Sequence, residues 1–233
     1  MSDTTGFLYP FIEAQESDAP SLLADLARSA RAKATQSREL QQQCLTAMAA
    51  ELAVAGVAMG ERFAAGGRLF TFGNGGSSTD AATLAAMFRN PAQGRAVPAW
   101  SLTDDQAVVT ALGNDVGFEL IFSRQLIAHG TDRDVAIALS TSGNSDDLLR
   151  GLAQARRGGL LTIAFAGYDG GAMAAADDVD HCFTVPSQSI HRIQESQAVL
   201  GHALWQHAQT ALAQHRRSGS RRAADPTPLG DLR

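Results

Sequence analysis

Residues 72–79 read FGNGGSST and stand between a strand-like segment, Arg68–Thr71, and the alanine-rich stretch at 80–88. Gly75 and Gly76 allow positive φ and a close approach of the backbone to a ligand. The helix that follows would present unpaired N–H groups and a partial positive charge at its start. A strand, a glycine turn (residues 73–78) and a helix in this order are typical of an α/β fold that binds an anion at the turn.

Short apolar runs recur along the chain and alternate with helical patterns. Residues before Gly66 read as helices, with apolar side chains at steps of three or four. The apolar runs are 68–72, 96–102, 134–140, 160–165 and 181–185. Runs of about five apolar residues between helices predict a parallel sheet covered on both faces. The sequence therefore predicts a three-layer α/β sandwich with extra helices at both ends, the last helix covering 189–215.

Composition limits the kinds of partner that the chain could have. The chain has 233 residues, of which 45% are hydrophobic, enough for one core of ordinary size. Its net charge of -5 gives no general reason to bind nucleic acid or an anionic membrane. Cys44 and Cys182 form neither a metal-binding spacing nor a disulfide framework, which fits a reducing cytosol. No apolar run of about 18 residues and no secretory signal are present, so we expect a cytoplasmic protein.

A second polar turn, STSGNS at 140–145, follows the run VAIAL just as the glycine turn follows RLFTF. The loops at the carboxyl ends of parallel strands share one edge of the sheet, so this serine turn (residues 140–145) could flank the same pocket. Its hydroxyls suit a monophosphate. Neither turn has the spacing of a nucleoside-triphosphate or dinucleotide loop, which disfavours ATP and NAD. The alternative is that both turns only connect elements and cap helices, with Ser145, Asp146 and Asp147 as a simple helix start.

Five motifs in order give the chain a family resemblance. They are GNGGSSTDA, GNDVGFELIFSRQL, STSGNS, GYDGG and RIQESQAVLGH, spread over about residues 38–212. Together they resemble the sugar isomerase (SIS) domain, and within it the bacterial phosphoheptose isomerases. The resemblance implies a flavodoxin-like sheet of five parallel strands and a homotetramer whose pocket is completed by a neighbouring subunit. It also implies isomerisation of a phosphorylated sugar, sedoheptulose 7-phosphate, to D-glycero-D-manno-heptose 7-phosphate.

The resemblance also implies roles for particular residues. It implies that the substrate is bound by Asn74, Gly75 and Gly76 at the sugar, by Ser77, by Asn114 and Asp115 nearby, by Gln194 on the late helix, and by Ser140, Thr141, Ser142 and Ser145 at the phosphate. Aldose–ketose interconversion needs an acid and a base, which in the family are a histidine and a glutamate. His202 is the catalytic candidate because it lies two helical turns after Gln194. The alternative is that His202 is an ordinary packing or surface residue.

Two positions depart from the family pattern. Where the family has a histidine and, four residues later, a glutamate that together help to bind zinc, this chain has Thr83 and Met87. Of the four metal positions of the family, this chain matches only Gln194 and His202. Because a thioether neither takes a proton nor binds zinc well, and two ligands do not make a zinc site, we expect no metal and no cofactor. The carboxylates that could replace the glutamate are Asp80, Asp104, Asp105, Asp115 and Glu195. Helix capping by Asp80, a solvated turn for Asp104 and Asp105, and an outward-pointing Glu195 are the alternatives.

Two functions remain open after these departures. One is an intramolecular aldose-ketose isomerase of the phosphoheptose type. The other is a non-catalytic sugar-phosphate sensor or assembly factor, like a replication-initiator-associating relative that also lacks the glutamate. The expected organisation is a partly helical extension at 1–37, the SIS domain at 38–214 and a disordered, locally basic tail at 215–233.

Overall fold

The computed structural model describes residues 19–223, so parts of both predicted terminal segments, 1–18 and 224–233, lie outside the described residues. The chain divides into two units, residues 1–40 and 41–233. Helix α3 (Ala19–Ala47) begins in the first unit and ends in the second. The predicted extension therefore contains a helix, and the second unit contains the whole sheet.

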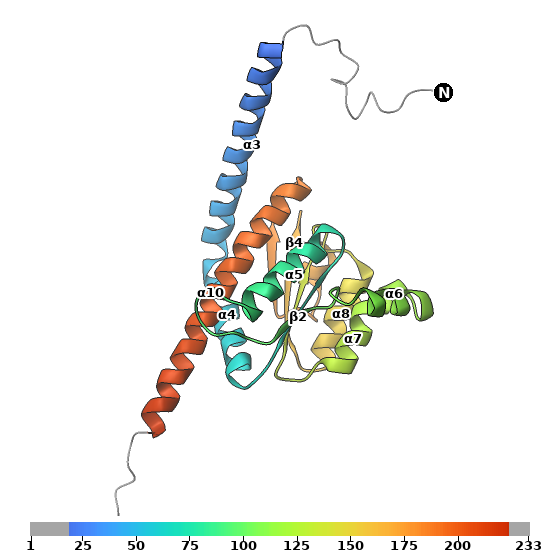
Figure 1. The fold of residues 1–233 in the computed structure, drawn as a ribbon, viewed down its shortest axis with the longest axis vertical. Coiled ribbons are helices and arrows are strands. Elements are labelled where there is room, and N and C mark those ends of the chain that lie inside the picture. The colour runs from blue at the N-terminus through green and yellow to red at the C-terminus, as the bar shows by residue number, and fades with distance from the viewer. Residues whose placement is uncertain (1–18, 224–233) are drawn as a thin grey trace, which may run out of the picture. The chain divides into compact units, whose positions relative to one another are not determined.

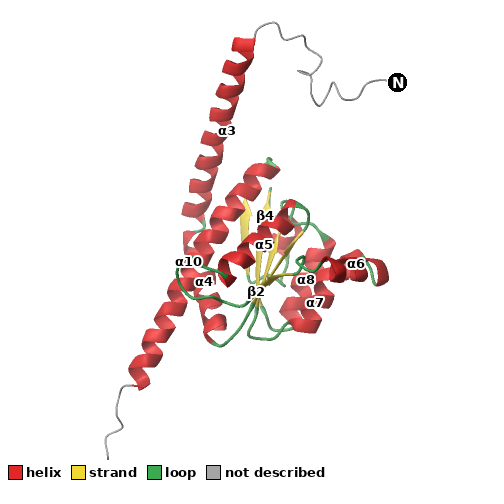
Figure 2. Ribbon diagram, viewed as in Figure 1, coloured by secondary structure: helices red, strands yellow, loops and turns green. Residues whose placement is uncertain are grey.

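The sheet has five parallel strands in the order β2-β1-β3-β4-β5. Figures 1 and 2 show the sheet with helices around it. The strands are β1 Leu69–Gly73, β2 Ala99–Ser101, β3 Val135–Leu139, β4 Leu161–Gly167 and β5 His181–Val185. Each one lies within or overlaps a predicted apolar run, because strands covered on both faces carry apolar side chains on both. The α/β prediction with five parallel strands is confirmed.

Helices cover both faces of this sheet, as the three-layer prediction requires. They are α4 Ala49–Ala64, α5 Gly76–Arg89, α6 Gln106–Asp115, the 3-10 turn η1 Phe118–Leu120, α7 Ile121–His129, α8 Asp146–Arg157, α9 Gly171–Ala175 and α10 Ile190–Ala223. Helices α4, α5 and α10 lie on one side of the sheet, and α7 and α8 lie on the other (Figure 1). Helix α10 continues past residue 214, the predicted end of the domain.

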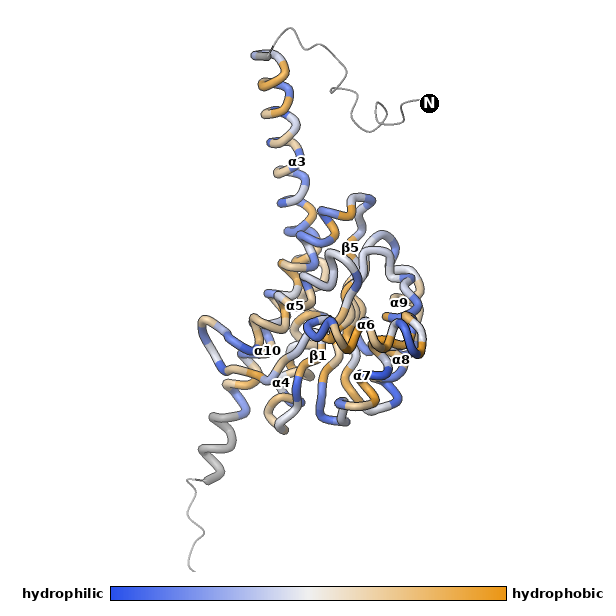
Figure 3. Tube along the Cα trace, turned by 45° about the vertical axis from the view of Figure 1, so that its right-hand side comes forward, coloured by the Kyte–Doolittle hydropathy of each residue, from blue (hydrophilic) through white to orange (hydrophobic). Residues whose placement is uncertain are grey.

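The core consists mainly of aromatic and aliphatic side chains from the central strands. Every residue of β1, β3 and β4 is buried. Phe72 packs on Phe122 of α7 with ring centroids 5.0 Å apart, and Phe165 packs on Phe183 at 5.3 Å. Burying one such side chain contributes about 2–3 kcal/mol. Figure 3 shows the hydrophobic stretches of the chain gathering at the sheet.

An ion pair between the partly exposed Arg68 and the buried Asp134 lies at the amino edge of the sheet. The Asp134 side chain is 1% exposed and accepts hydrogen bonds from the Arg68 backbone at 2.7 Å, from Arg68 Nη2 at 2.8 Å and from Thr131. Burial alone would raise the pKa of Asp134, but the hydrogen bonds from Arg68 and Thr131 outweigh burial and hold it below its usual range. This pair therefore stabilises the entry to β1 and β3.

No single helix among residues 19–223 is long and apolar enough to cross a membrane. One bent pair of helices, Pro20–Ala47 with Ala49–Ala64, meets that criterion by length and composition alone.

Candidate functional site

The two polar turns leave neighbouring strands at the same level of the sheet. Gly73, the last residue of β1, pairs in register with Leu139, the last residue of β3. The glycine turn leads into α5 and the serine turn into α8, so the amino ends of both helices face the carboxyl edge. The prediction that the turns share one edge is confirmed.

The glycine turn uses backbone groups to begin α5. Gly75 has φ +54° at the N-cap position, a conformation that favours glycine, and no side chain caps the helix there. Ser77 is buried, and its N–H donates to Asn74 O at 3.0 Å. A Cβ atom added to Gly76 would lie 2.6 Å from Gln194 Nε2. The absence of a side chain at 76 thus lets the amide of α10 approach the turn.

The serine turn is held by a network of internal hydrogen bonds. Ser140 is 4% exposed, and its Oγ accepts from the Gly143 N–H at 2.9 Å. The buried amide of Gln197 donates to Ser140 O at 2.8 Å. Gly143 has φ +68°, and a Cβ atom there would lie 2.1 Å from Gly170 O. Ser140 and Gly143 therefore shape the turn, whereas the partly exposed Thr141, Ser142 and Ser145 are accessible to a ligand.

A direct side-chain contact joins the two turns. Asn74 Nδ2 lies 3.1 Å from Asp147 Oδ1 and 2.8 Å from Asp147 Oδ2. Asp147 lies in the first turn of α8 and is 5% exposed. Burial raises the pKa of this carboxyl group, partly offset by the hydrogen bond from Asn74. Sequence reasoning treated Asp147 only as part of a helix start, because nothing in the sequence pairs it with a residue 73 positions earlier.

Helix α10 reaches the same edge through Gln194. Its Nε2 donates to Asp80 Oδ2 at 2.9 Å. The alternative role predicted for Asp80, capping of α5, is wrong: the helix begins at Gly76, so Asp80 is its fifth residue. The carboxylate instead fixes the amide that lies against Gly76.

A cavity of about 300 Å³ opens beside the glycine turn. Asn74 and Gly75 line one side of it, and Thr103, Gln106 and Thr110 line another. These last three residues were missed by sequence reasoning. The signal was present, since Thr103 follows the carboxyl end of β2 as the two turns follow β1 and β3. The cavity therefore extends the polar edge toward α6.

Three predicted residues lie on the surface of the chain. Asn114 and Asp115 are exposed at the end of α6, where Asn114 Nδ2 donates to Asp115 Oδ1 at 2.8 Å. His202 is exposed on α10, and its ring centroid lies 5.4 Å from that of Trp205. Asn114, Asp115 and His202 are not among the residues that line the 300 Å³ cavity.

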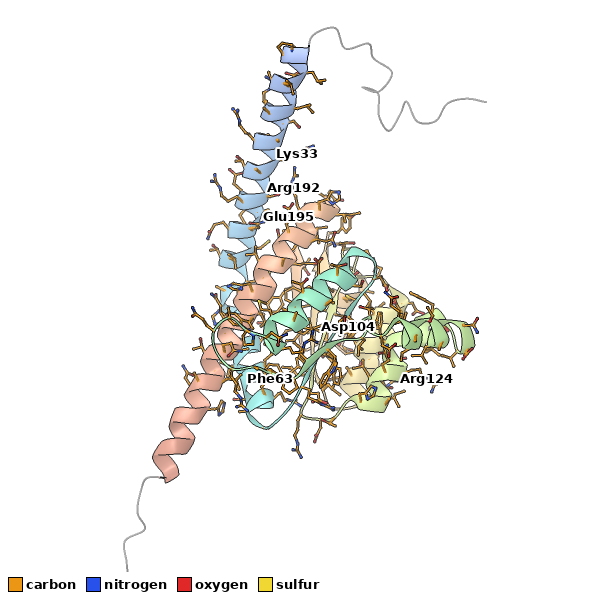
Figure 4. The ribbon with its side chains drawn as sticks, in the orientation of Figure 1. Lys33, Phe63, Asp104, Arg124, Arg192 and Glu195 are labelled. Atoms are coloured by element: carbon orange, nitrogen blue, oxygen red, sulfur yellow. The ribbon has the colours of Figure 1, made fainter. Side chains whose placement is uncertain are left out.

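The remaining candidate carboxylates take various positions. Asp105 caps α6 by accepting from the N–H groups of Ala107 and Val108. Asp104 is exposed near the end of β2, with an oxygen 4.0 Å from Arg89 Nη1. Glu195 is exposed on the stretch of α10 that also carries Arg192, as Figure 4 shows. The buried carboxylate at the edge, Asp147, was not among the predicted candidates.

The donor set at the family's metal positions does not fit zinc. Thr83 Oγ1 donates to Thr79 O at 2.9 Å within α5, and Met87 follows one turn later. Zinc is poorly served by these four groups: the Thr83 hydroxyl in a helical hydrogen bond, the Met87 thioether, the Gln194 amide and the single imidazole of His202. Among residues 19–223, no cluster of three or more His, Cys, Asp or Glu side chains could hold a metal.

A five-stranded parallel sheet with two polar turns joined at its carboxyl edge defines an α/β protein, a class in which ligands bind at that edge. The SIS domain family matches residues 34–167, and the chain belongs to this family. It is 47% identical over 141 residues to a phosphoheptose isomerase of Aquifex aeolicus, covering 60% of this chain and 73% of the relative. It is 45% identical over 166 residues to a phosphoheptose isomerase of Paramagnetospirillum magneticum, covering 66% of this chain and 85% of that relative.

Solved structures agree with this assignment. A phosphoheptose isomerase from Neisseria gonorrhoeae superposes with a TM-score of 0.70 at 33% identity, covering 77% of this chain and 96% of that one. The Francisella tularensis enzyme gives a TM-score of 0.73 at 29% identity, covering 79% and 98%. The chain is thus a homologue of phosphoheptose isomerases over most of its length.

Proposed function

We propose that this chain binds a phosphorylated ketose at the carboxyl edge of its sheet and isomerises it to the aldose. The proposed substrate is sedoheptulose 7-phosphate, and the product is D-glycero-D-manno-heptose 7-phosphate. The single observation that carries the proposal is the hydrogen bond between Asn74 and Asp147. It joins the glycine turn to the serine turn, and so provides one anchor for a sugar and one for its phosphate.

The phosphate is proposed to lie in the serine turn. Thr141, Ser142 and Ser145 are partly exposed there, and the first N–H groups of α8 add a favourable dipole. The sugar is proposed to extend past Asn74 toward Gln194, whose amide lies against Gly76. Ser140 supports this arrangement by holding the turn.

Proton transfer is assigned to His202 in this proposal. Because His202, Asn114 and Asp115 are exposed in one copy, we infer that neighbouring copies in a cytoplasmic homotetramer complete the pocket with these groups. An imidazole titrates near neutral pH and can move a proton between two oxygens.

The direct test is turnover of sedoheptulose 7-phosphate by the purified protein, with the product followed by NMR. Ser142→Ala should raise KM about tenfold by removing one hydroxyl donor to the phosphate. Thr210→Ala is the matched control, because this exposed hydroxyl bonds Gln206 O of its own helix. Failure of the protein to convert any ketose phosphate of five to seven carbons would reject the isomerase.

A non-catalytic sugar-phosphate-binding role is the second candidate. The residues that favour it are Thr83 and Met87, which replace the family's histidine and glutamate on α5. Calorimetric binding of sedoheptulose 7-phosphate without turnover would support this role. Under the isomerase proposal, Met87→Glu should raise kcat, whereas a binding protein that lacks other catalytic groups stays inactive.

A further inference from the structure

Asp147 is a carboxylate that is buried although it lies in the first turn of a surface helix. It is 5% exposed in the first turn of α8, whereas its neighbour Asp146 has a side chain that is 64% exposed and pairs with Arg150. Burying a carboxylate is costly unless hydrogen bonds compensate. At Asp147 the compensating bonds come from Asn74, on the other turn of the site, and from the backbone N–H groups of Asp147 and Leu148. The free-energy cost of burying the Asp147 carboxylate is therefore compensated in part only when the glycine turn holds Asn74 within hydrogen-bond distance.

The contact fixes which way the Asn74 amide faces. An ionised carboxylate only accepts hydrogen bonds, so the nitrogen of the amide must face Asp147 and the oxygen must face away. Asn74 also lines the 300 Å³ cavity with Gly75. An amide oxygen that faces away from Asp147 is left as an acceptor for a hydroxyl group of a ligand.

The backbone of the glycine turn depends on the same residue. Asn74 O accepts from the Ser77 N–H at 3.0 Å, which begins α5. A change in the side chain of Asn74 would therefore also affect the backbone that leads into Gly76. The Gln194 amide lies against this backbone. The opposite anchor is firm, because the serine turn before Asp147 is held by Gln197 and Gly143.

We propose that Asp147 is a positioning residue: its buried carboxylate accepts the Asn74 amide, couples the two turns and sets the Asn74 oxygen toward the sugar. This inference rests on the proposed function for its ligand, a phosphorylated sugar. It assigns to Asp147 no proton transfer of its own. The role requires an acceptor at this position, and an amide oxygen supplies one as well as a carboxylate does.

The chain offers a matched set of variants for the test. Asp147→Ala removes the acceptor, and Asp147→Asn retains an oxygen that can accept from Asn74. Asp146→Ala is the control, because it removes a carboxylate from the same helical turn but breaks only an exposed pair with Arg150. Thermal unfolding of each variant shows that it is folded.

Amide hydrogen exchange measures, without any substrate, whether Asp147 holds the glycine turn in place. In Asp147→Ala the amides of residues 75–78 should exchange about tenfold faster, as expected when a hydrogen bond to a charged group is lost. Asp147→Asn and Asp146→Ala should exchange as the wild type does. Unchanged exchange in Asp147→Ala would overturn the coupling of the turns, whether or not the protein is an isomerase.

Steady-state kinetics with sedoheptulose 7-phosphate measures how much Asp147 contributes to substrate binding. Asp147→Ala should raise KM about tenfold with kcat within about twofold, because the Asn74 contact is made equally in ground and transition states. Asn74→Ala should do the same, and the double variant should lose no more. A general loss of structure would instead lower kcat at unchanged KM.

Two kinetic results would overturn the proposal. One is an unchanged KM in Asp147→Ala. The other is a loss of kcat in Asp147→Asn as large as in Asp147→Ala, which would make the carboxylate a proton-transfer group. If the wild type turns over no sugar phosphate, the proposed function fails, and the hydrogen-exchange comparison still decides whether Asp147 positions the glycine turn.

Discussion

Gln194 Nε2 on α10 donates a 2.9 Å hydrogen bond to the carboxylate of Asp80 on α5, a residue 114 positions earlier in the chain. The same amide lies so close to Gly76 that a Cβ atom there would come within 2.6 Å of the nitrogen. The C-terminal helix is therefore connected to the glycine turn at the point where the sugar is proposed to bind.

Gly76→Ala should impair the site without unfolding the protein. The backbone φ of Gly76 is not positive, and the atom that the new methyl group meets is the end of a flexible side chain. Gln194 should move and lose Asp80, which raises KM for the sugar phosphate about tenfold, while Tm changes by only about 2 °C. Steady-state kinetics and calorimetry measure the two effects.

The control is Gly113→Ala in α6, where an added Cβ meets its nearest neighbour, Phe118, at an ordinary 3.8 Å. This variant should keep KM and gain up to about 1 kcal/mol in helix stability. An equal KM for Gly76→Ala and the wild type would show that Gln194 does not contact the ligand.

His202→Ala should lower kcat at least about 100-fold if the imidazole transfers the proton. The side chain is exposed and its ring is tilted at 30° to that of Trp205, so Tm should hardly change. His191→Ala, an exposed histidine on the same helix, is the control and should retain full kcat. A His202→Ala variant with wild-type kcat would leave this histidine as an ordinary surface residue and favour the binding protein.

The strands could be predicted because burial on both faces leaves a local signal, an apolar run at each of β1 to β5. The edge of the sheet followed from the same pattern, since Gly73 and Leu139 end parallel strands. Side-chain pairing across the edge left no such signal. Asp147 looked like a helix start, and Asp80 looked like a cap, because hydrogen bonds over 73 and 114 residues depend on packing rather than on neighbours in the sequence.

Asp134→Asn should destabilise the fold by about 3 kcal/mol, because it leaves the donors of Arg68 and Thr131 facing an amide instead of a buried carboxylate. For a domain of this size, the loss in Tm is about 6–12 °C. Calorimetry at pH 7 measures it. Asp132→Ala is the control, because its side chain is exposed and two residues away, and it should change Tm by about 1 °C or less.

The pH dependence of this effect follows from the lowered pKa of Asp134. The unfolded chain binds a proton near pH 3.9, above the pKa in the folded state, so stability rises with pH in that range. The contribution is complete above the unfolded value and is lost as pH falls through the folded one. The Tm difference between wild type and Asp134→Asn should therefore narrow below about pH 4; a constant difference would contradict an ionic role.

Asp147→Asn should show the opposite dependence, because burial raises the pKa of Asp147 above that of the unfolded chain. The folded state then binds the proton more tightly, and the stability that this gives is lost as pH rises through the folded pKa. The amide variant carries no such cost, so its Tm should gain on the wild type between about pH 4 and pH 7. Asp146→Asn, at an exposed carboxyl group, should follow the wild type over this range, and calorimetry at several pH values compares all three. A Tm of Asp147→Asn that instead falls behind the wild type with rising pH would mean that the ionised carboxylate stabilises the fold, and that its hydrogen bonds to Asn74 outweigh its burial.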